Sequence, residues 1–329
     1  MLNKAFIVGG AGFIGSHFVD SLLAQSDINA VTIYDNFSSG KKWHLSQHKN
    51  DKRFRLIEGD ISNYEYLRQS MVGHDTVIHL ASNPDIARAA GEPAIDFEQG
   101  TQLTHYILEA MRMTGTSRIL YASGSGVYGD VGELEVSENF GPQIPISTYG
   151  ASKLAGEALI AAYAHMFDMS GLAFRFGNVV GPRQTHGVGF DFIRKLKETP
   201  NELTILGDGQ QSKSYVYISD IVNAVLLANE KVNEHFAVFN VATGDYITVQ
   251  EIANIAVKKV VGDLSKVKLS FTGGDRGWKG DIPVVRLNID KIRNLGWKCH
   301  HTSVEAIEKS ISGMLEEMNC DQETANIYD

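Results

Sequence analysis

The sequence predicts an α/β fold in which a doubly wound parallel sheet is followed by a smaller, partly interleaved C-terminal lobe. Apolar runs alternate with helix-like stretches, a glycine-rich turn follows the first run, and the pattern changes after Gly177. Strand–helix alternation is typical of parallel sheets because each crossover passes through a helix. The predicted strands are KAFIVG, AVTIYD, FRLIEG, DTVIHL, RILYAS and GLAFRF.

Two helical segments stand out between these strands. One runs from Ala94 to Met113 and the other from Ser147 to Phe167, with Ser147 or Thr148 as the candidate N-cap. Both segments have apolar side chains around more than one face, which predicts burial on more than one side.

After Gly177 the chain contains loops, the short strands LTIL and SYVYI, and helices over Val249 to Val261 and Val304 to Met318. We therefore predict a first domain over residues 1–177. Residues 178–329 mainly form a second lobe, and some of its segments return to the first domain.

The composition is that of a soluble enzyme, with 329 residues, 43% hydrophobic residues and a formal net charge of −9. This negative charge argues against nucleic acid as a partner, and no run is long enough to span a membrane. The cysteines, Cys299 and Cys320, do not form a disulfide framework or a zinc motif, so we expect a cytoplasmic protein. No histidine group completes a metal site, and none is predicted.

The stretch FIVGGAGFIGSHF places Gly9, Gly10, Gly12 and Gly15 between a strand and a helix. Glycines allow backbone N–H groups to approach a pyrophosphate, which the helix N-terminus stabilises. Asp35 ends the next strand, where a carboxylate accepts hydrogen bonds from ribose hydroxyls and repels a 2′-phosphate. The motif predicts a dinucleotide site that prefers NAD to NADP.

The stretch YGASK places Tyr149 and Lys153 four residues apart, on one face of a helix. A phenol has a pKa near 10, so it can act as a base at neutral pH only beside a positive charge. We expect the Lys153 ammonium to lower the pKa of Tyr149 by about two to three units at an effective dielectric constant near 20.

Together these motifs resemble the extended short-chain dehydrogenases/reductases, in particular the nucleotide-sugar epimerase group that includes UDP-glucose 4-epimerase. The resemblance covers nearly the whole chain through GGAGFIG, YDNFSSG, VIHLAS, SGVYGD, YGASK, RFGNVVGPRQ and ILGDGQQSKSYVYISDI. It implies a Rossmann domain that binds NAD and a later lobe that binds the nucleotide sugar. It also implies a homodimer through a four-helix bundle.

The resemblance assigns residues to the site. The catalytic residues would be Tyr149 and Lys153, with Ser123 or Ser125 in place of the hydroxyl that relatives carry where this chain has Gly124. The NAD contacts would be Gly9, Gly12, Phe13, Ile14, Gly15, Asp35, Asn36, Asp60, Ile61, Leu80, Ala81, Ser82, Tyr149 and Lys153. The substrate contacts would be Asn178, Arg183, Lys213 and Arg276.

The turn before VYG helps to choose among the reactions of this group. Dehydratases carry an Asp-Glu pair there and decarboxylases a Glu, whereas this chain has Ser125 and Gly126. The resemblance therefore implies 4-epimerisation of a nucleotide sugar, UDP-linked and of hexose type, through a transient 4-keto sugar. A 4-keto nucleotide-sugar reductase that uses NAD(P)H and a dinucleotide-sensing protein without catalysis are the alternatives.

Overall fold

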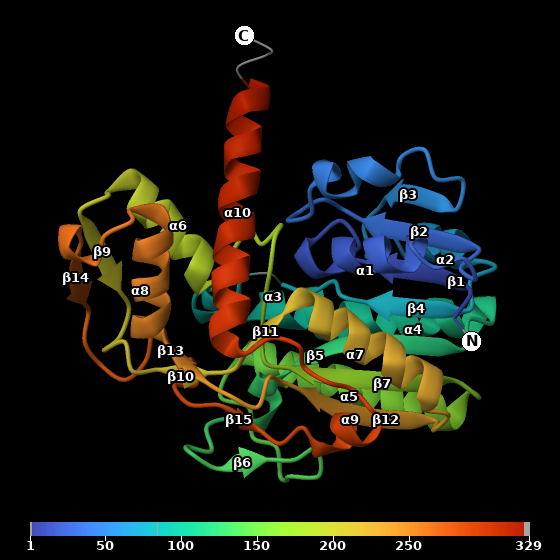
Figure 1. Ribbon diagram of the computed structural model, residues 1–329. Helices are drawn as coiled ribbons and strands as arrows, with labels where there is room; N and C mark the ends of the chain where they lie inside the picture. Colours follow the sequence, from blue (N-terminus) through green and yellow to red (C-terminus); the bar gives the residue numbers. More distant parts are fainter. Residues whose placement is uncertain (1, 84, 326–329) are drawn as a thin grey trace.

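The computed structural model describes residues 2–83 and 85–325, and within them seven parallel strands form the central sheet in the order β12-β7-β5-β4-β1-β2-β3 (Figure 1). The six strands predicted from the sequence are the first six of these in chain order. The seventh, β12, comes from the C-terminal half and lies beside β7. The bounds are β1 Lys4–Val8, β2 Ala30–Asp35, β3 Phe54–Glu58, β4 Thr76–His79, β5 Arg118–Gly124, β7 Ser170–Phe176 and β12 Phe236–Val241.

Helices cover both faces of the sheet because its strands are apolar on both sides. In β1, Ile7 packs into one core, whereas Phe6 and Val8 pack into the other. The first core is covered by α1 (Phe13–Leu23) and α7 (Ile218–Lys231). The second is covered by α2 (Tyr64–Met71), α4 (Leu103–Thr114) and α5 (Thr148–Met166). This arrangement confirms the doubly wound class.

The predicted helix from Ala94 to Met113 is not a uniform α-helix. A short α3 (Ala94–Asp96) leads through a π-helical stretch at Phe97–Gln102 into α4. Ser147 is the N-cap of α5, since its side chain accepts a hydrogen bond from the Gly150 N–H. The other candidate cap, Thr148, bonds elsewhere.

The second lobe has a core of its own. It is built from α6 (Val188–Glu198), α8 (Val249–Val260) and α10 (Ser303–Ala325), and α10 extends well beyond the rest of the molecule (Figure 1). Four two-stranded sheets lie outside the central sheet within the described residues. They pair β8 (Asn178–Val180) with β11 (Tyr215–Tyr217), β9 (Glu202–Ile205) with β14 (Lys268–Phe271), β10 (Ser212–Lys213) with β13 (Ile247–Thr248), and β6 (Glu135–Val136) with β15 (Arg286–Leu287). The remaining helix, α9, spans Asp290–Asn294.

His79 at the end of β4 makes the stability of the fold depend on pH. The side chain is 1% exposed, and burial, aided by Lys153, lowers its pKa from 6.5 to about 3. Below pH 6.5 the unfolded chain binds a proton at His79, whereas the folded chain binds it only near pH 3. The free energy of unfolding therefore decreases as the pH falls from 6.5 to about 3. We expect the stability advantage of the native protein over His79→Gln to shrink by a few kcal/mol across this range, measured by urea unfolding. An advantage that did not change with pH would contradict this.

Candidate active site

A cavity of about 1210 Å³ opens along the carboxyl ends of the central strands, between the sheet and the second lobe. Parallel sheets of this type bind ligands at this edge because the loops and helix N-termini converge there. Of the predicted site residues, those that line the cavity are Gly9, Gly12, Phe13, Ile14, Gly15, Asp35, Asn36, Asp60, Ile61, Leu80, Ala81, Ser82, Ser123, Ser125, Tyr149, Lys153, Asn178 and Lys213.

The glycine-rich turn has the shape that a pyrophosphate needs. Gly9 has a φ of +81°, and a Cβ there would lie 2.8 Å from the Ala81 nitrogen. A Cβ at Gly12 would point into open space, with only the Gly9 oxygen at 3.4 Å. The first turn of α1 carries no acidic residue and no side-chain cap, so its N–H groups are available to an anion.

The ribose and adenine ends of the cavity carry carboxylates. Asp35 is 8% exposed, and its oxygens accept hydrogen bonds from the Ala11 N–H at 2.9 Å and the Phe37 N–H at 2.8 Å. Asp60 accepts from Asn36 Nδ2 at 2.8 Å. Lys42, which would favour a 2′-phosphate, pairs with Glu58 at 2.9 Å. The geometry therefore fits NAD better than NADP.

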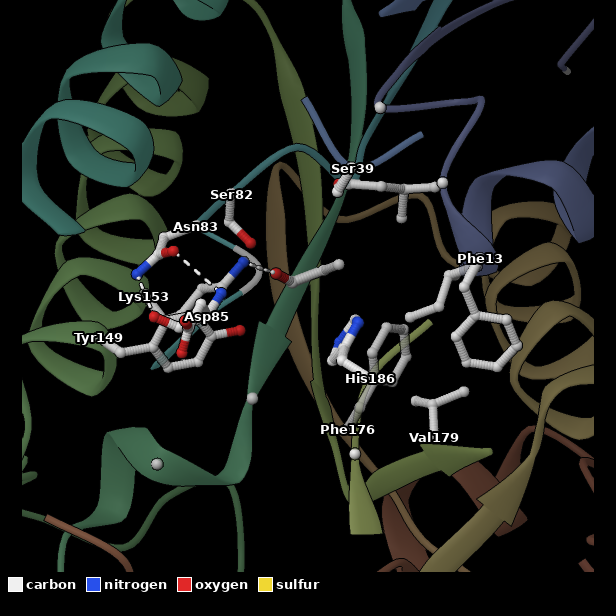
Figure 2. A pocket seen from close by; sticks show the side chains of 18 of the residues that line it. Phe13, Ser39, Ser82, Asn83, Asp85, Tyr149, Lys153, Phe176, Val179 and His186 are labelled. Atoms are coloured by element: carbon white, nitrogen blue, oxygen red, sulfur yellow. Dashed lines mark hydrogen bonds between the residues drawn. The ribbon is translucent and has the colours of Figure 1, made fainter. Parts of the chain in front are cut away.

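Tyr149 and Lys153 lie on one side of the cavity, facing Phe13 and Phe176 across it (Figure 2). The Lys153 ammonium donates to the Ala122 carbonyl oxygen at 2.8 Å and lies 5.5 Å from the centre of the Tyr149 ring. The Ser82 side chain lies near the pair in the same cavity (Figure 2). The helix and the strand ends thus place a phenol, an ammonium and a hydroxyl together.

The expectation that Lys153 lowers the pKa of Tyr149 is wrong for the protein without its cofactor. The pKa of Tyr149 is raised to about 12, mainly because a phenolate in this site loses its hydration and to a smaller extent because of the Asp96 carboxylate. Burial also lowers the pKa of Lys153 to about 8, although Asp96 and Glu157 act in the opposite direction. Proximity in sequence revealed the pair but not the cost of burying it.

Ser123 is not free to serve as the catalytic hydroxyl, which corrects the sequence-based assignment. Its Oγ donates to Glu157 Oε1 at 2.5 Å, and Glu157 forms a buried ion pair with Arg175. Ser125, in a short 3₁₀ turn at Ser125–Tyr128, lines the cavity. Ser82 also lines the cavity and acts to lower the pKa of Tyr149, although the sequence assigned it only to the cofactor.

The two predicted substrate arginines are absent from the residues that line the cavity. Arg183 pairs with Asp20 of α1 at 2.7 Å. Arg276 pairs with Asp130 at 2.5 Å and donates to the Asp281 carbonyl oxygen at 2.6 Å. Lys213 does line the cavity, where its Nζ lies 2.6 Å from Asp281 Oδ1. These acidic partners are distant in sequence, so spacing could not reveal them.

The structure adds polar cavity residues that the sequence had not assigned to the site, among them Asn83, Asp85 and Asp191. Asn83 and Asp85 follow β4 directly, and a position after a parallel strand was the signal that could have found them. His186 also lines the cavity, and desolvation there lowers its pKa. Among the described residues, no group of three or more His, Cys, Asp or Glu side chains could hold a metal ion.

Residues 5–242 match the model of the NAD dependent epimerase/dehydratase family. The chain belongs to this family. It is 31% identical over 317 residues to a putative UDP-glucose 4-epimerase of Methanocaldococcus jannaschii, covering 94% of this chain and 97% of that protein. Membership confirms the predicted resemblance, the fold class and NAD as the cofactor.

Solved structures agree with the family assignment. The chain superposes on a UDP-glucose 4-epimerase from Thermotoga maritima, solved with UDP-glucose, with a TM-score of 0.84 at 30% identity and coverage of 96% and 99% of the two chains. A dTDP-glucose 4,6-dehydratase from Streptomyces venezuelae, solved with NAD, gives 0.87 at 26% identity and coverage of 96% and 98%. The fold alone therefore does not separate epimerase from dehydratase.

Proposed function

We propose that the protein is an NAD-dependent UDP-sugar 4-epimerase that acts on a UDP-hexose. The observation that carries this is that Tyr149, Lys153 and Ser82 line one cavity of about 1210 Å³ together with the glycine-rich turn and residues of the second lobe. The turn at Ser125–Tyr128 contains no carboxylate, whereas elimination of water needs an acid and a base besides the tyrosine. The relatives named as UDP-glucose 4-epimerases support the same reaction.

In this mechanism Tyr149 removes the proton from the C4 hydroxyl of the sugar and later returns it. NAD held by the glycine-rich turn and Asp35 would supply a hydride acceptor for C4, and its positive charge would favour the Tyr149 phenolate. Lys153 supplies a second positive charge, and Ser82 donates a hydrogen bond to the phenolate. The 4-keto sugar turns within the cavity before the hydride returns, so C4 is inverted with no net oxidation.

We assign residues 1–177 to the cofactor and the later lobe mainly to the nucleotide sugar. Asn178 and Lys213 are the cavity residues of that lobe that we assign to the sugar nucleotide. Segments of the later half return to the first domain, because β12 joins the central sheet and α7 packs against α1.

The test is to incubate the purified protein, without added cofactor, with UDP-glucose, UDP-galactose and their N-acetyl and uronic acid counterparts, and to resolve the products by NMR. Interconversion of one C4 pair supports the proposal and names the sugar. Turnover that requires added NADPH and yields a reduced sugar supports the reductase. The absence of any conversion, with NAD bound, leaves only a dinucleotide-binding protein.

We further propose a homodimer through α4 and α5, which pack against each other on one face of the sheet. Large apolar side chains are exposed on or next to these helices, with Met166 at 70%, Phe97 at 59% and Met113 at 54%. A second copy that supplies the same two helices would cover this surface as a four-helix bundle.

Among the described residues no helix is long and apolar enough to cross a membrane. We assign the protein to the cytoplasm, where NAD and nucleotide sugars are available.

Met166→Glu should convert the dimer to a monomer, because a charge in a twofold interface is buried twice. Sedimentation velocity measures the change. The matched control is Val72→Glu, at a residue that is 62% exposed and lies after α2. A monomeric native protein would contradict the proposal.

A further inference from the structure

Asp96 is a buried carboxylate behind the catalytic pair to which the sequence assigned no role. It ends α3 and is 1% exposed. Its Oδ1 accepts a hydrogen bond from Asn83 Nδ2 at 2.9 Å, and its Oδ2 accepts one from Thr148 Oγ1 at 2.7 Å. Within the described residues no lysine or arginine lies at ion-pair distance from it. A carboxylate this deeply buried is costly, so it calls for a functional explanation.

The two donors to Asp96 are the direct chain neighbours of two active-site residues. Thr148 precedes Tyr149 in the first turn of α5, and Asn83 follows Ser82, which lines the cavity beside the pair. Asn83 also donates to the Asp85 carbonyl oxygen at 2.9 Å and accepts from the Asp85 N–H at 3.0 Å. Figure 2 shows Ser82, Asn83 and Asp85 grouped around Tyr149 and Lys153. Asp96 therefore ties the loop after β4 to the helix that carries the tyrosine.

Asp96 is also the charge that acts on both members of the pair. Its carboxylate raises the pKa of Tyr149 and that of Lys153. Of the two members of the pair, Glu157 raises the pKa of Lys153 alone, and its carboxylate already forms an ion pair with Arg175.

The other titratable groups that face the pair from the sheet carry no charge at neutral pH. Tyr121 on β5 has a pKa raised above its usual value by burial, and that of His79 on β4 is lowered to about 3. Desolvation is the largest influence on both pKa values, and Asp96 is the nearby negative charge that raises both of them.

We propose that Asp96 is a positioning residue for the catalytic pair, which ties the loop that carries Ser82 to the first turn of α5 and favours the pair as phenol and ammonium. The proposal builds on the proposed epimerase function but concerns this chain's own residues. The Asp96 charge adds to the desolvation that already disfavours the phenolate, and it opposes the desolvation that disfavours the ammonium. The phenolate then forms only when the cofactor's positive charge is present.

The test is Asp96→Asn, which removes the charge and keeps the shape. Its amide oxygen can accept from Asn83, and its N–H group can donate to Thr148 Oγ1, since a hydroxyl is also an acceptor. Loss of the negative charge favours the phenolate and disfavours the ammonium, so both ionisations should move to lower pH by about half to one unit.

Two readouts follow these ionisations in the NAD-loaded protein. The first is the ultraviolet absorbance of tyrosinate against pH, taken as the difference between each protein and the same protein with Tyr149→Phe. This readout needs no sugar. The second is the pH profile of kcat, whose acidic and alkaline limbs should both move to lower pH.

The control is Thr148→Val, which removes one hydrogen bond to Asp96 and no charge. It should lower kcat and leave both limbs and the tyrosinate transition in place. If Asp96→Asn also leaves them in place, Asp96 has no electrostatic role and the proposal falls. Should Asp96→Asn not fold, Asp96→Ser gives the same neutral test.

The two proposals fail separately. A tyrosinate transition that moves in a protein that converts no nucleotide sugar keeps the role of Asp96 and overturns the epimerase. Epimerisation by a protein whose tyrosinate transition does not move keeps the epimerase and overturns the role of Asp96.

Discussion

Tyr149→Phe should lower kcat for epimerisation by about 10²- to 10⁴-fold, the usual contribution of a positioned acid–base group. The variant keeps the ring, whose centre lies 5.5 Å from the Lys153 ammonium, and loses only the hydroxyl. NAD should therefore stay bound. The measurement is the initial rate with the sugar pair that the NMR panel identifies, together with the NAD content of the purified protein.

The control for this variant is Tyr66→Phe, which changes a tyrosine that is 42% exposed and does not line the cavity. It should retain the native rate. A Tyr149→Phe protein with native activity would mean that another group moves the C4 proton, and the proposed mechanism would have to be abandoned.

Glu157→Ala should cause the largest loss of stability among the substitutions considered. Glu157 Oε2 lies 2.7 Å from Arg175 Nη2, and the two side chains are 5% and 4% exposed. Removing the carboxylate leaves a buried guanidinium without its counter-ion and Ser123 without its acceptor. Removing one partner of such a pair costs about 3–5 kcal/mol. Urea unfolding of the two proteins measures the difference.

The matched control is Glu198→Ala, which breaks an Arg–Glu pair of 2.9 Å on the surface of α6. Its side chains are 50% and 60% exposed, so water replaces the lost partner and the cost should stay below about 1 kcal/mol. Equal losses in the two variants would show that the buried pair adds nothing beyond a surface pair.

Much of the fold could be predicted because its signals are local. The glycine turn, the strand that ends at Asp35 and the Ser147 cap each act within a few residues, so the sequence places them correctly. The π-helical stretch before α4 was not predicted, since a single inserted residue hardly changes the helical periodicity. The return of β12 to the sheet could be anticipated only in general terms, because strand pairing is a long-range contact.

The site was predicted wherever spacing along one element determines it, as for Tyr149 and Lys153 on one helix face. It was missed wherever a partner comes from another part of the chain. Asp20 pairs with Arg183 and Asp130 pairs with Arg276, and neither arginine lines the cavity. Ser123 does line it, but its hydroxyl donates to Glu157.

By itself the sequence determined the class of fold, the glycine-rich turn and the placement of Tyr149 and Lys153 on one helix face, because hydrophobic periodicity, glycine and helical spacing are properties of short segments. The tertiary structure alone decided which polar side chains reach the cavity and what charge they carry there. Burial raises the pKa of Tyr149, and the Asp96 carboxylate, which belongs to another helix, contributes to the same rise. Desolvation and long-range electrostatics depend on everything packed around a group, which no short stretch of sequence specifies.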